Sequence, residues 1–200
     1  MSHSFSTRTA SVERTTAETD VTIDLSLDGD GSYDVDTGVG FFDHMLDLFA
    51  KHGDLDLTVR CDGDLGVDDH HTVEDVSIAL GQALHEALGD KKYIARYGHA
   101  YVPMDDALAR SVIDLSGRAF CRVDAAWGRE RVGDLSTEMV SHVWRSMAEH
   151  ARCNLHVTVL HGKNTHHKVE AAFKATARAL RMAIRRDATH PEVASTKGTV

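Results

Sequence analysis

The chain has 200 residues, 42% of them hydrophobic and 26% charged, which is the composition of a globular protein and excludes wholesale disorder. Its net charge of −9 argues against a nucleic-acid-binding protein, because such proteins carry an excess of basic residues. No apolar run is long enough for a membrane span, and the first residues lack the apolar core of a signal peptide. The three cysteines form no CxxC pair, so we expect neither a disulfide framework nor a thiolate metal site, and we expect a cytoplasmic protein.

The first half of the chain alternates strands with helices. Strands are predicted where apolar and polar residues alternate, and helices where apolar residues recur every three or four positions. We expect residues 1–6 to be disordered and residues 7–93 to form the first half of a repeat. In chain order, the predicted elements are a strand over 20–28, a hairpin turn at 28–31, a short strand over 33–36, a helix over 41–52 capped by Gly53, a strand over 55–61, and a helix over 71–88 that ends at Gly89.

The second half, residues 94–186, repeats this order. Its predicted elements are strands over 108–115 and 119–125, a helix over 139–151, a strand over 155–160 and a helix over 167–186. Residues 187–200 form a polar C-terminal tail. We therefore predict an α+β fold made of an internally duplicated strands-helix-strand-helix unit, with helices packed on one face of each sheet and both halves in one compact domain.

Histidines carry the strongest functional signal. The chain has 14 of them, and the pattern His-His-x-x-Glu occurs at residues 70–74 and again at 166–170, each time near the start of the second helix of its half. One further histidine precedes each copy, His44 by 26 residues and His142 by 24. A duplicated fold has to repeat its hydrophobic pattern, but it does not have to repeat histidines and glutamates. Their repetition therefore indicates that a functional site was duplicated together with the fold.

The spacing of these residues fits metal ligation. On a helix, the glutamate of each copy lies three and four residues after the two histidines, so at least one histidine shares its face. Two adjacent histidines project about 100° apart, which suits two different ions better than one. A group of three imidazoles and one carboxylate suits an octahedral divalent ion, and the spacing leaves manganese, iron, cobalt, nickel and zinc open. The predicted ligands are His44, His70, His71, Glu74, His142, His166, His167 and Glu170.

A second set of residues is typical of phosphate binding. Guanidinium groups chelate phosphate through two hydrogen bonds, lysine supplies a point charge, and a Gly-containing loop adds backbone N–H groups. Each residue alone has an ordinary alternative, the arginines as solvated surface groups and Lys174 as a helical ion-pair partner of Glu170. The candidates are Arg96, Arg118, Lys174, Ser195 and Lys197.

These residues lie in motifs that resemble the imidazoleglycerol-phosphate dehydratase family. The resemblance runs from Arg8 to Gly198, with the motifs in the family's order. It departs from the family pattern at Gly40 and Ala119, where proline is usual, and at Asp106, where glutamate is common. The motifs are FFDHML at 41–46, DDHHTVED at 68–75, PMDDALA at 103–109, SGRAF at 116–120 and GKNTHHKVEAAFKA at 162–175.

The resemblance implies a fold like domain 2 of ribosomal protein S5, with two manganese(II) ions in each active site. It implies that one ion is held by His44, His71, Glu74 and His167, and the other by His70, His142, His166 and Glu170. It also implies a homo-oligomer of 24 subunits built from trimers, with active sites shared between neighbouring chains.

The implied reaction is metal-dependent loss of water from D-erythro-imidazole glycerol phosphate, giving imidazole acetol phosphate in histidine biosynthesis. Its difficulty is the removal of a carbon-bound proton that no neighbouring carbonyl acidifies, so a metal on the imidazole nitrogens and a carboxylate base are both expected. The candidate catalytic residues are Glu18, Asp105, His71 and His167. Glu18 is also expected to contact the substrate, and the tail with Lys197 is expected to close over the phosphate.

Two other functions stay open from the residues alone. A dinuclear metal-dependent hydrolase would use two ions to activate water and would need no imidazole ring in its substrate. A metal-storage or structural metal-binding protein would keep its metal and tolerate substitution of Glu18 or Arg96. An assay for the ketone product, with and without manganese, distinguishes the hydrolase from the dehydratase.

Overall fold

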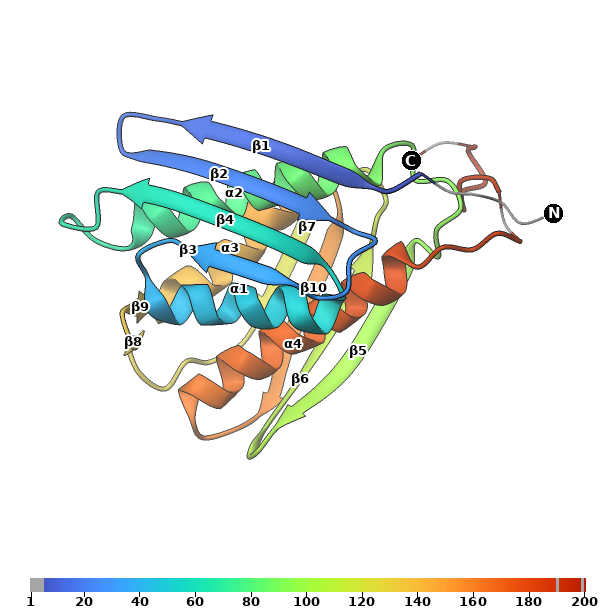
Figure 1. Ribbon diagram of the computed structural model, residues 1–200. Helices are drawn as coiled ribbons and strands as arrows, with labels where there is room; N and C mark the ends of the chain where they lie inside the picture. The colour runs from blue at the N-terminus through green and yellow to red at the C-terminus, as the bar shows by residue number, and fades with distance from the viewer. Residues whose placement is uncertain (1–5, 190, 199) are drawn as a thin grey trace.

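The structure of the protein, a computed structural model, describes residues 6–189, 191–198 and 200. The segment expected to be disordered, residues 1–6, lies outside the described residues except for Ser6. The two halves have matching elements (Figure 1). The first half contains β1 (Thr9–Thr15), β2 (Thr19–Ser26), β3 (Tyr33–Asp36), α1 (Gly40–Gly53), β4 (Asp56–Gly63) and α2 (His70–Leu88). The second contains β5 (Tyr97–Met104), β6 (Ala107–Asp114), β7 (Phe120–Asp124), β8 (Arg131–Val132), β9 (Leu135–Ser136), α3 (Thr137–His150), β10 (Asn154–His161) and α4 (Thr165–Ile184).

Each half forms a four-stranded sheet with the same topology. The strand order is β1-β2-β4-β3 in the first sheet and β5-β6-β10-β7 in the second. The equivalent strands β3 and β7 pair in parallel with β4 and β10, and the other neighbours in these two sheets are antiparallel. The matching order confirms the predicted α+β fold and its duplication.

The four helices lie between the two sheets. α1 and α2 cover the first sheet, α3 and α4 cover the second, and the halves meet where α1 packs on α4 and α2 packs on α3 (Figure 1). Aromatic rings fill this interior: the Trp144 ring centroid lies 4.4 Å from that of Phe173 and 6.3 Å from that of Phe49. Truncation of a buried ring of this size to alanine costs about 3–5 kcal/mol. One hydrophobic core therefore serves both halves.

The structure differs from the predicted elements in local details. The predicted hairpin between 20–28 and 33–36 is wrong, because β1 and β4 occupy both edges of β2 and leave β3 to pair in parallel with β4. Gly53 is the last residue of α1, and the left-handed cap is Asp54, with a φ of 52°. The sequence pattern also misses β1, β5 and the β8–β9 ribbon. An edge strand needs few buried residues, and in β1 a single residue, Val12, is buried.

Strand β5 lies unusually close to α4. A Cβ on Gly98 would stand 1.8 Å from the carbonyl oxygen of Ala179, so a larger residue does not fit there. The backbone N–H of Arg96 donates to the carbonyl oxygen of Ala183 at 2.9 Å. These contacts tie the start of the second half to the C-terminal end of α4, whereas all four helices begin at the opposite end of the molecule (Figure 1).

Candidate metal centres and phosphate pocket

The first cluster consists of His70 and Glu74 of α2 and His142 of α3. One potential ligand atom from each residue lies within 4.8 Å of the other two. His142 Nε2 is 2.8 Å from Glu74 Oε1, and the His70 and His142 ring centroids are 5.1 Å apart. The first cluster exists because α2 and α3 pack side by side, so it joins residues from both halves.

The second cluster consists of His44 of α1 and His166 and Glu170 of α4, again within 4.8 Å of one another. Glu170 Oε2 lies 3.1 Å from His166 Nε2 and 4.0 Å from His44 Nε2. The side chain of Asn164 caps α4 by accepting a hydrogen bond from the His166 backbone N–H at 2.9 Å. Because α4 begins at Thr165, both His166 and Glu170 are helical, and their spacing of four residues places them one turn apart on the same face.

The electrostatics of the second cluster centre on Glu170, which is 5% exposed. Burial raises the pKa of this carboxyl, but the hydrogen bond and charge of Lys174, together with His166, outweigh burial and hold the net pKa below its usual value. The Lys174 ammonium contacts Glu170 directly, one helical turn further along α4. Glu170 is therefore held ionised, as a metal ligand must be.

Within one chain, the ligands group differently from the sets that the resemblance implied. His44 lies with Glu170 rather than with Glu74, and His142 lies with Glu74 rather than with Glu170. The physical reason is the pairing of helices across the halves: α1 packs on α4, and α2 packs on α3. Each cluster thus combines the first helix of one half with the second helix of the other.

The remaining two histidines, His71 and His167, stand apart from these clusters. His71 Nδ1 lies 3.0 Å from Asp64 Oδ2, and His167 Nδ1 lies 2.7 Å from Asp106 Oδ1. The hydrogen bond to Asp64 raises the pKa of His71, with smaller contributions from nearby carboxylates. A carboxylate on Nδ1 favours the tautomer whose Nε2 lone pair is free, an arrangement typical of metal-binding histidines.

A second carboxylate stands close to each of these imidazoles. Glu18 Oε1 is 3.6 Å from His71 Nε2, and Asp105 Oδ2 is 3.6 Å from His167 Nε2. Glu18 lies in the β1–β2 turn and Asp105 in the β5–β6 turn, which are equivalent positions in the two halves. The structure therefore places all four predicted catalytic residues in two similar histidine–carboxylate pairs.

Sequence reasoning did not assign roles to Asp64 and Asp106. The available signal for Asp64 was an acidic residue directly after the strand that precedes the first His-His-x-x-Glu motif. Asp106 also accepts a hydrogen bond from the backbone N–H of Asn164 at 3.1 Å, and its contact with His167 holds its pKa well below the usual range. No local sequence pattern predicts that Asp106 contacts His167 and Asn164, because the β5–β6 turn comes close to α4 only in the folded chain.

Four of the five predicted phosphate residues line one pocket of about 530 Å³: Arg96, Arg118, Ser195 and Lys197. Asp114 holds the Arg96 guanidinium through hydrogen bonds of 2.7 and 3.1 Å, and the carbonyl oxygen of Ala194 in the tail accepts a third. The fifth residue, Lys174, lies instead in the second cluster, where it pairs with Glu170 and stands 3.5 Å from Met104 Sδ.

The pocket and the clusters lie at opposite ends of α4. His166 begins the helix, and Ala183, whose carbonyl accepts the Arg96 N–H, lies 17 residues later. At 1.5 Å per residue these positions are about 25 Å apart along the helix axis. Figure 1 shows the tail at one end of the molecule and the helix N-termini at the other.

Among the described residues, no helix has the length and hydropathy needed to cross a bilayer.

Comparison with known proteins identifies the family. Two curated relatives carry the name imidazoleglycerol-phosphate dehydratase: that of Salinibacter ruber is 76% identical over 98% of both chains, and that of Chloroherpeton thalassium is 54% identical over 96% of this chain and 98% of its own.

The solved structures agree. A crystal structure of the dehydratase from Staphylococcus aureus matches with a TM-score of 0.81 and 41% identity, covering 89% of this chain and 99% of that one. One from Pyrococcus furiosus matches with the same TM-score and 33% identity, covering 94% and 100%. The family model for imidazoleglycerol-phosphate dehydratase matches residues 37–180, a span that holds every residue of both clusters. The chain belongs to the imidazoleglycerol-phosphate dehydratase family of hydro-lyases.

Proposed function

We propose that the chain removes water from imidazoleglycerol phosphate to give imidazole acetol phosphate, a step of histidine biosynthesis, at a centre built around the two clusters. The observation that carries this proposal is the pair of matching donor sets, each with two imidazoles and one carboxylate. Such donors can hold metal ions, and the ring nitrogens of an imidazole substrate are themselves good ligands for an ion held there.

Each cluster fits a divalent ion, and we propose manganese(II) in both. Two imidazole nitrogens and one carboxylate oxygen in each cluster suit ions of intermediate hardness, and neither cluster contains the thiolate ligands that soft ions prefer. When bound, the ions act as Lewis acids that polarise the imidazole ring of the substrate. Glu74 and Glu170 would each supply one negative charge to the ion of their cluster, which offsets half of its double positive charge.

We propose that His71 and His167 complete the ligand sets of neighbouring copies. Each cluster has two imidazoles, one fewer than the three that its half of the sequence provides. Asp64 and Asp106 orient the two remaining imidazoles with Nε2 free. An assembly of 24 subunits built from trimers, as the family resemblance implies, provides the neighbours.

The acid–base work falls to Glu18 and Asp105. Glu18 is half-exposed and stands on a tight turn, where it can reach a substrate that lies against His71. We assign to Glu18 the uptake of the carbon-bound proton, while the neighbouring hydroxyl takes a proton from solvent and leaves as water, so that one C–H and one C–O bond break and a C=C bond forms. The enol that remains becomes the ketone, and Asp105 holds the equivalent position beside His167.

The phosphate is held by a different chain from the one whose cluster faces the ring. One glycerol unit joins ring and phosphate in the substrate, which is far shorter than the roughly 25 Å between the second cluster and the Arg96 pocket. We propose that Arg96, Arg118, Ser195 and Lys197 of one copy, together with Lys174 of another, bind the phosphate. The arginines supply paired hydrogen bonds and the tail closes over the ligand.

The three cysteines support a location in the reducing cytoplasm. Cys61, Cys121 and Cys153 are all free thiols. Burial raises the pKa of Cys61 and of Cys121 to about 11, so neither is a reactive thiolate at neutral pH.

A direct assay tests the proposal. The manganese-loaded protein is given imidazoleglycerol phosphate, and the ketone product and free phosphate are both measured. We expect ketone without phosphate release, and a loss of at least about 100-fold in kcat for Glu18→Gln. Glu13→Gln, an exposed substitution on β1, serves as the control and keeps full activity. Phosphate release without ketone would instead identify a metal-dependent hydrolase.

A further inference from the structure

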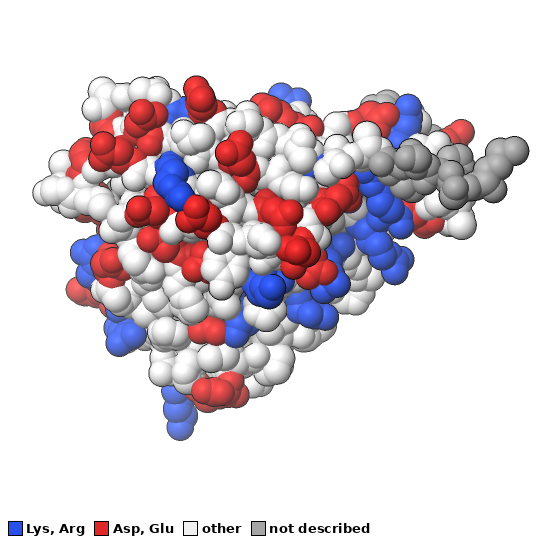
Figure 2. Space-filling view, in the orientation of Figure 1, with Lys and Arg blue, Asp and Glu red and all other residues white. Residues whose placement is uncertain are grey.

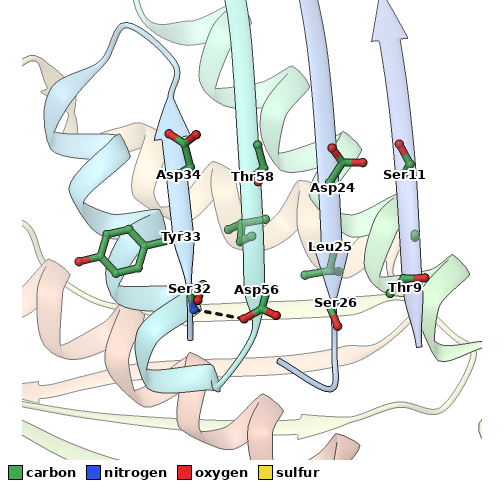
Figure 3. Close-up of a pocket in the computed structure, with 12 residues that line it drawn as sticks. Thr9, Ser11, Asp24, Leu25, Ser26, Ser32, Tyr33, Asp34, Asp56 and Thr58 are labelled. Atoms are coloured by element: carbon green, nitrogen blue, oxygen red, sulfur yellow. Dashed lines mark hydrogen bonds between the residues drawn. The ribbon is translucent and has the colours of Figure 1, made fainter. Parts of the chain in front are cut away.

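The two faces of the first sheet differ in polarity, except near the β1–β2 turn. Acidic side chains are spread over the outer side of this sheet (Figure 2). There Ser11 of β1 pairs with Asp24 of β2 beside a shallow pocket (Figure 3). The side that faces the helices is apolar and includes the buried Val12. Next to the turn, however, Arg14 and Thr19 continue this helix-facing side in the alternation of their strands, and polar groups there need partners.

Both of these side chains bond to Asp75 of α2. The Thr19 hydroxyl donates to Asp75 Oδ2 at 2.5 Å, and the Arg14 guanidinium donates to Oδ1 at 2.8 and 3.0 Å. Thr16, inside the turn, also donates to Oδ2 at 3.3 Å. Asp75 is 5% exposed, unlike the acidic side chains on the outer surface. A carboxylate that is buried and bonded by three residues of the turn and its flanking strands joins that turn to the helix.

The turn held in this way carries Glu18. The backbone N–H groups of Glu18 and Thr19 donate to Thr16 Oγ1 at 3.1 and 3.0 Å, so the same hydroxyl contacts the buried carboxylate and shapes the turn. The backbone N–H of Asp64, just after β4, donates to the Glu18 carbonyl oxygen at 3.1 Å. The turn is therefore bonded both to α2 and to the end of β4, and it presents the Glu18 carboxylate 3.6 Å from His71 Nε2.

The second half holds its equivalent turn differently. The repeated motif places Ala171 at the position that corresponds to Asp75. The β5–β6 turn is held instead by Asp106, which accepts hydrogen bonds from two backbone N–H groups ahead of α4. The carboxylate that this turn presents, Asp105, is 70% exposed. The shared fold therefore does not require a carboxylate at the position of Asp75, and its presence in the first half coincides with the turn that carries Glu18.

We propose that Asp75 is a positioning residue for the reaction: it bonds the β1–β2 turn to α2 and thereby holds the Glu18 carboxylate beside His71. The inference rests on the proposed function for the role of Glu18 as the group that takes up the substrate proton. Misplacing a catalytic group by about 1 Å costs on the order of 100-fold in rate. A turn released from α2 therefore lowers kcat even when both clusters keep their ions.

Substitutions in the turn test the proposal without altering α2, where Asp75 adjoins the ligand Glu74. Thr19→Val removes the hydroxyl that donates to Asp75 and keeps the size of the side chain, whereas Thr19→Ser keeps the hydroxyl. Thr176→Val is the matched control, because the buried Thr176 hydroxyl joins α4 to Ser111 of β6 in the second half. For each manganese-loaded variant we would measure kcat, KM, manganese content and hydrogen exchange of the amides in the β1–β2 turn.

We expect Thr19→Val to lower kcat by about 10- to 100-fold, with KM changed by less than about twofold and manganese content unchanged. Amide exchange in the turn should become at least about tenfold faster. Thr19→Ser and Thr176→Val should keep kcat within about threefold of the wild type. In a Glu18→Gln background, Thr19→Val should lower kcat no further, because the group that it misplaces is already disabled.

Two results overturn the inference: an unchanged kcat in Thr19→Val, or an equal loss of kcat from this substitution with and without Glu18. The failure of the proposed function gives a different result, which is a wild type that makes no ketone. Hydrogen exchange then decides the structural claim by itself. Unchanged exchange of the turn amides in Thr19→Val would show that the contact with Asp75 does not hold the turn.

Discussion

The two clusters arose from one duplicated unit and keep the same donors, yet their surroundings differ. In the second cluster Glu170 is almost fully buried and forms an ion pair with Lys174, one helical turn further along α4. In the first cluster the Glu74 side chain is 36% exposed, and Ile78 occupies the position that corresponds to Lys174. A cation that binds in the second cluster must compete with Lys174. Duplication has therefore preserved the ligands while the charge around them diverged, and we expect the first cluster to bind its ion more tightly.

Removing one carboxylate from each cluster gives the largest expected effect. Glu74→Gln and Glu170→Gln should each lose one ion per chain and lower kcat/KM by at least about 100-fold, because a neutral amide neither balances nor ligates the ion as well. Elemental analysis counts the ions, and the ketone assay measures activity. If either variant keeps both ions and its activity, that cluster is not a metal site.

The carboxylates behind His71 and His167 sharpen the comparison. Asp64→Asn and Asp106→Asn should each lower activity by about 10- to 100-fold, since the imidazole loses its orienting acceptor. The two variants should differ in stability, because the Asp106 side chain also accepts a hydrogen bond from the backbone N–H of Asn164 ahead of α4. Among the described residues, the Asp64 side chain bonds the His71 imidazole and no backbone N–H. Thermal unfolding should therefore show a lower midpoint for Asp106→Asn alone. Equal midpoints would show that the hydrogen bond from the Asn164 N–H to Asp106 does not stabilise the fold.

Lys174 is the charged group that distinguishes the second cluster from the first, so replacing it should remove the expected difference in ion affinity. In Lys174→Met the second cluster should bind manganese as tightly as the first, because Glu170 loses its competing ammonium. KM for the phosphorylated substrate should rise about tenfold if the ammonium also binds phosphate, as proposed. Manganese titration and steady-state kinetics give the two readouts separately. A persistent affinity difference would place its cause elsewhere, for example in the burial of Glu170.

An ion pair far from both clusters gives the smallest effect and controls for general destabilisation. Burial opposes ionisation of Asp28, but the hydrogen bonds and charge of Arg8 prevail and lower its pKa from 3.8 to about 2. This pair therefore stabilises the fold above about pH 4 and loses that contribution as the pH falls towards 2. Asp28→Asn should lower the free energy of unfolding by about 1–2 kcal/mol at pH 7 after allowance for solvent screening.

Urea unfolding checks this prediction. The gap between the wild type and Asp28→Asn should close between pH 4 and pH 2, while manganese content and kcat at pH 7 stay unchanged. A gap that does not depend on pH would mean that the variant acts through something other than the charge.

The sequence predicted most of the elements and the eight candidate ligands, but not how those ligands combine. Periodicity found the buried helices and central strands, because their apolar residues recur with the period of the element. It missed β1 and β5, which are edge strands with little to bury. Helix geometry predicted that the two adjacent histidines of each pair would point in different directions. The structure agrees, since His70 joins a cluster and His71 does not. The partners of His44 and His142 depend on which helices pack across the halves, and no local pattern encodes that choice.

The length of α4 has a consequence for mixtures of defective chains. The phosphate pocket and the second cluster lie at opposite ends of this helix. If neighbouring chains share reaction centres as proposed, a chain damaged at one end still offers an intact other end to its neighbours. Co-expression of Glu170→Gln with Arg96→Ala should then generate some fully equipped reaction centres in hybrid particles. Two mutant alleles that are each inactive alone should complement one another and restore growth without added histidine.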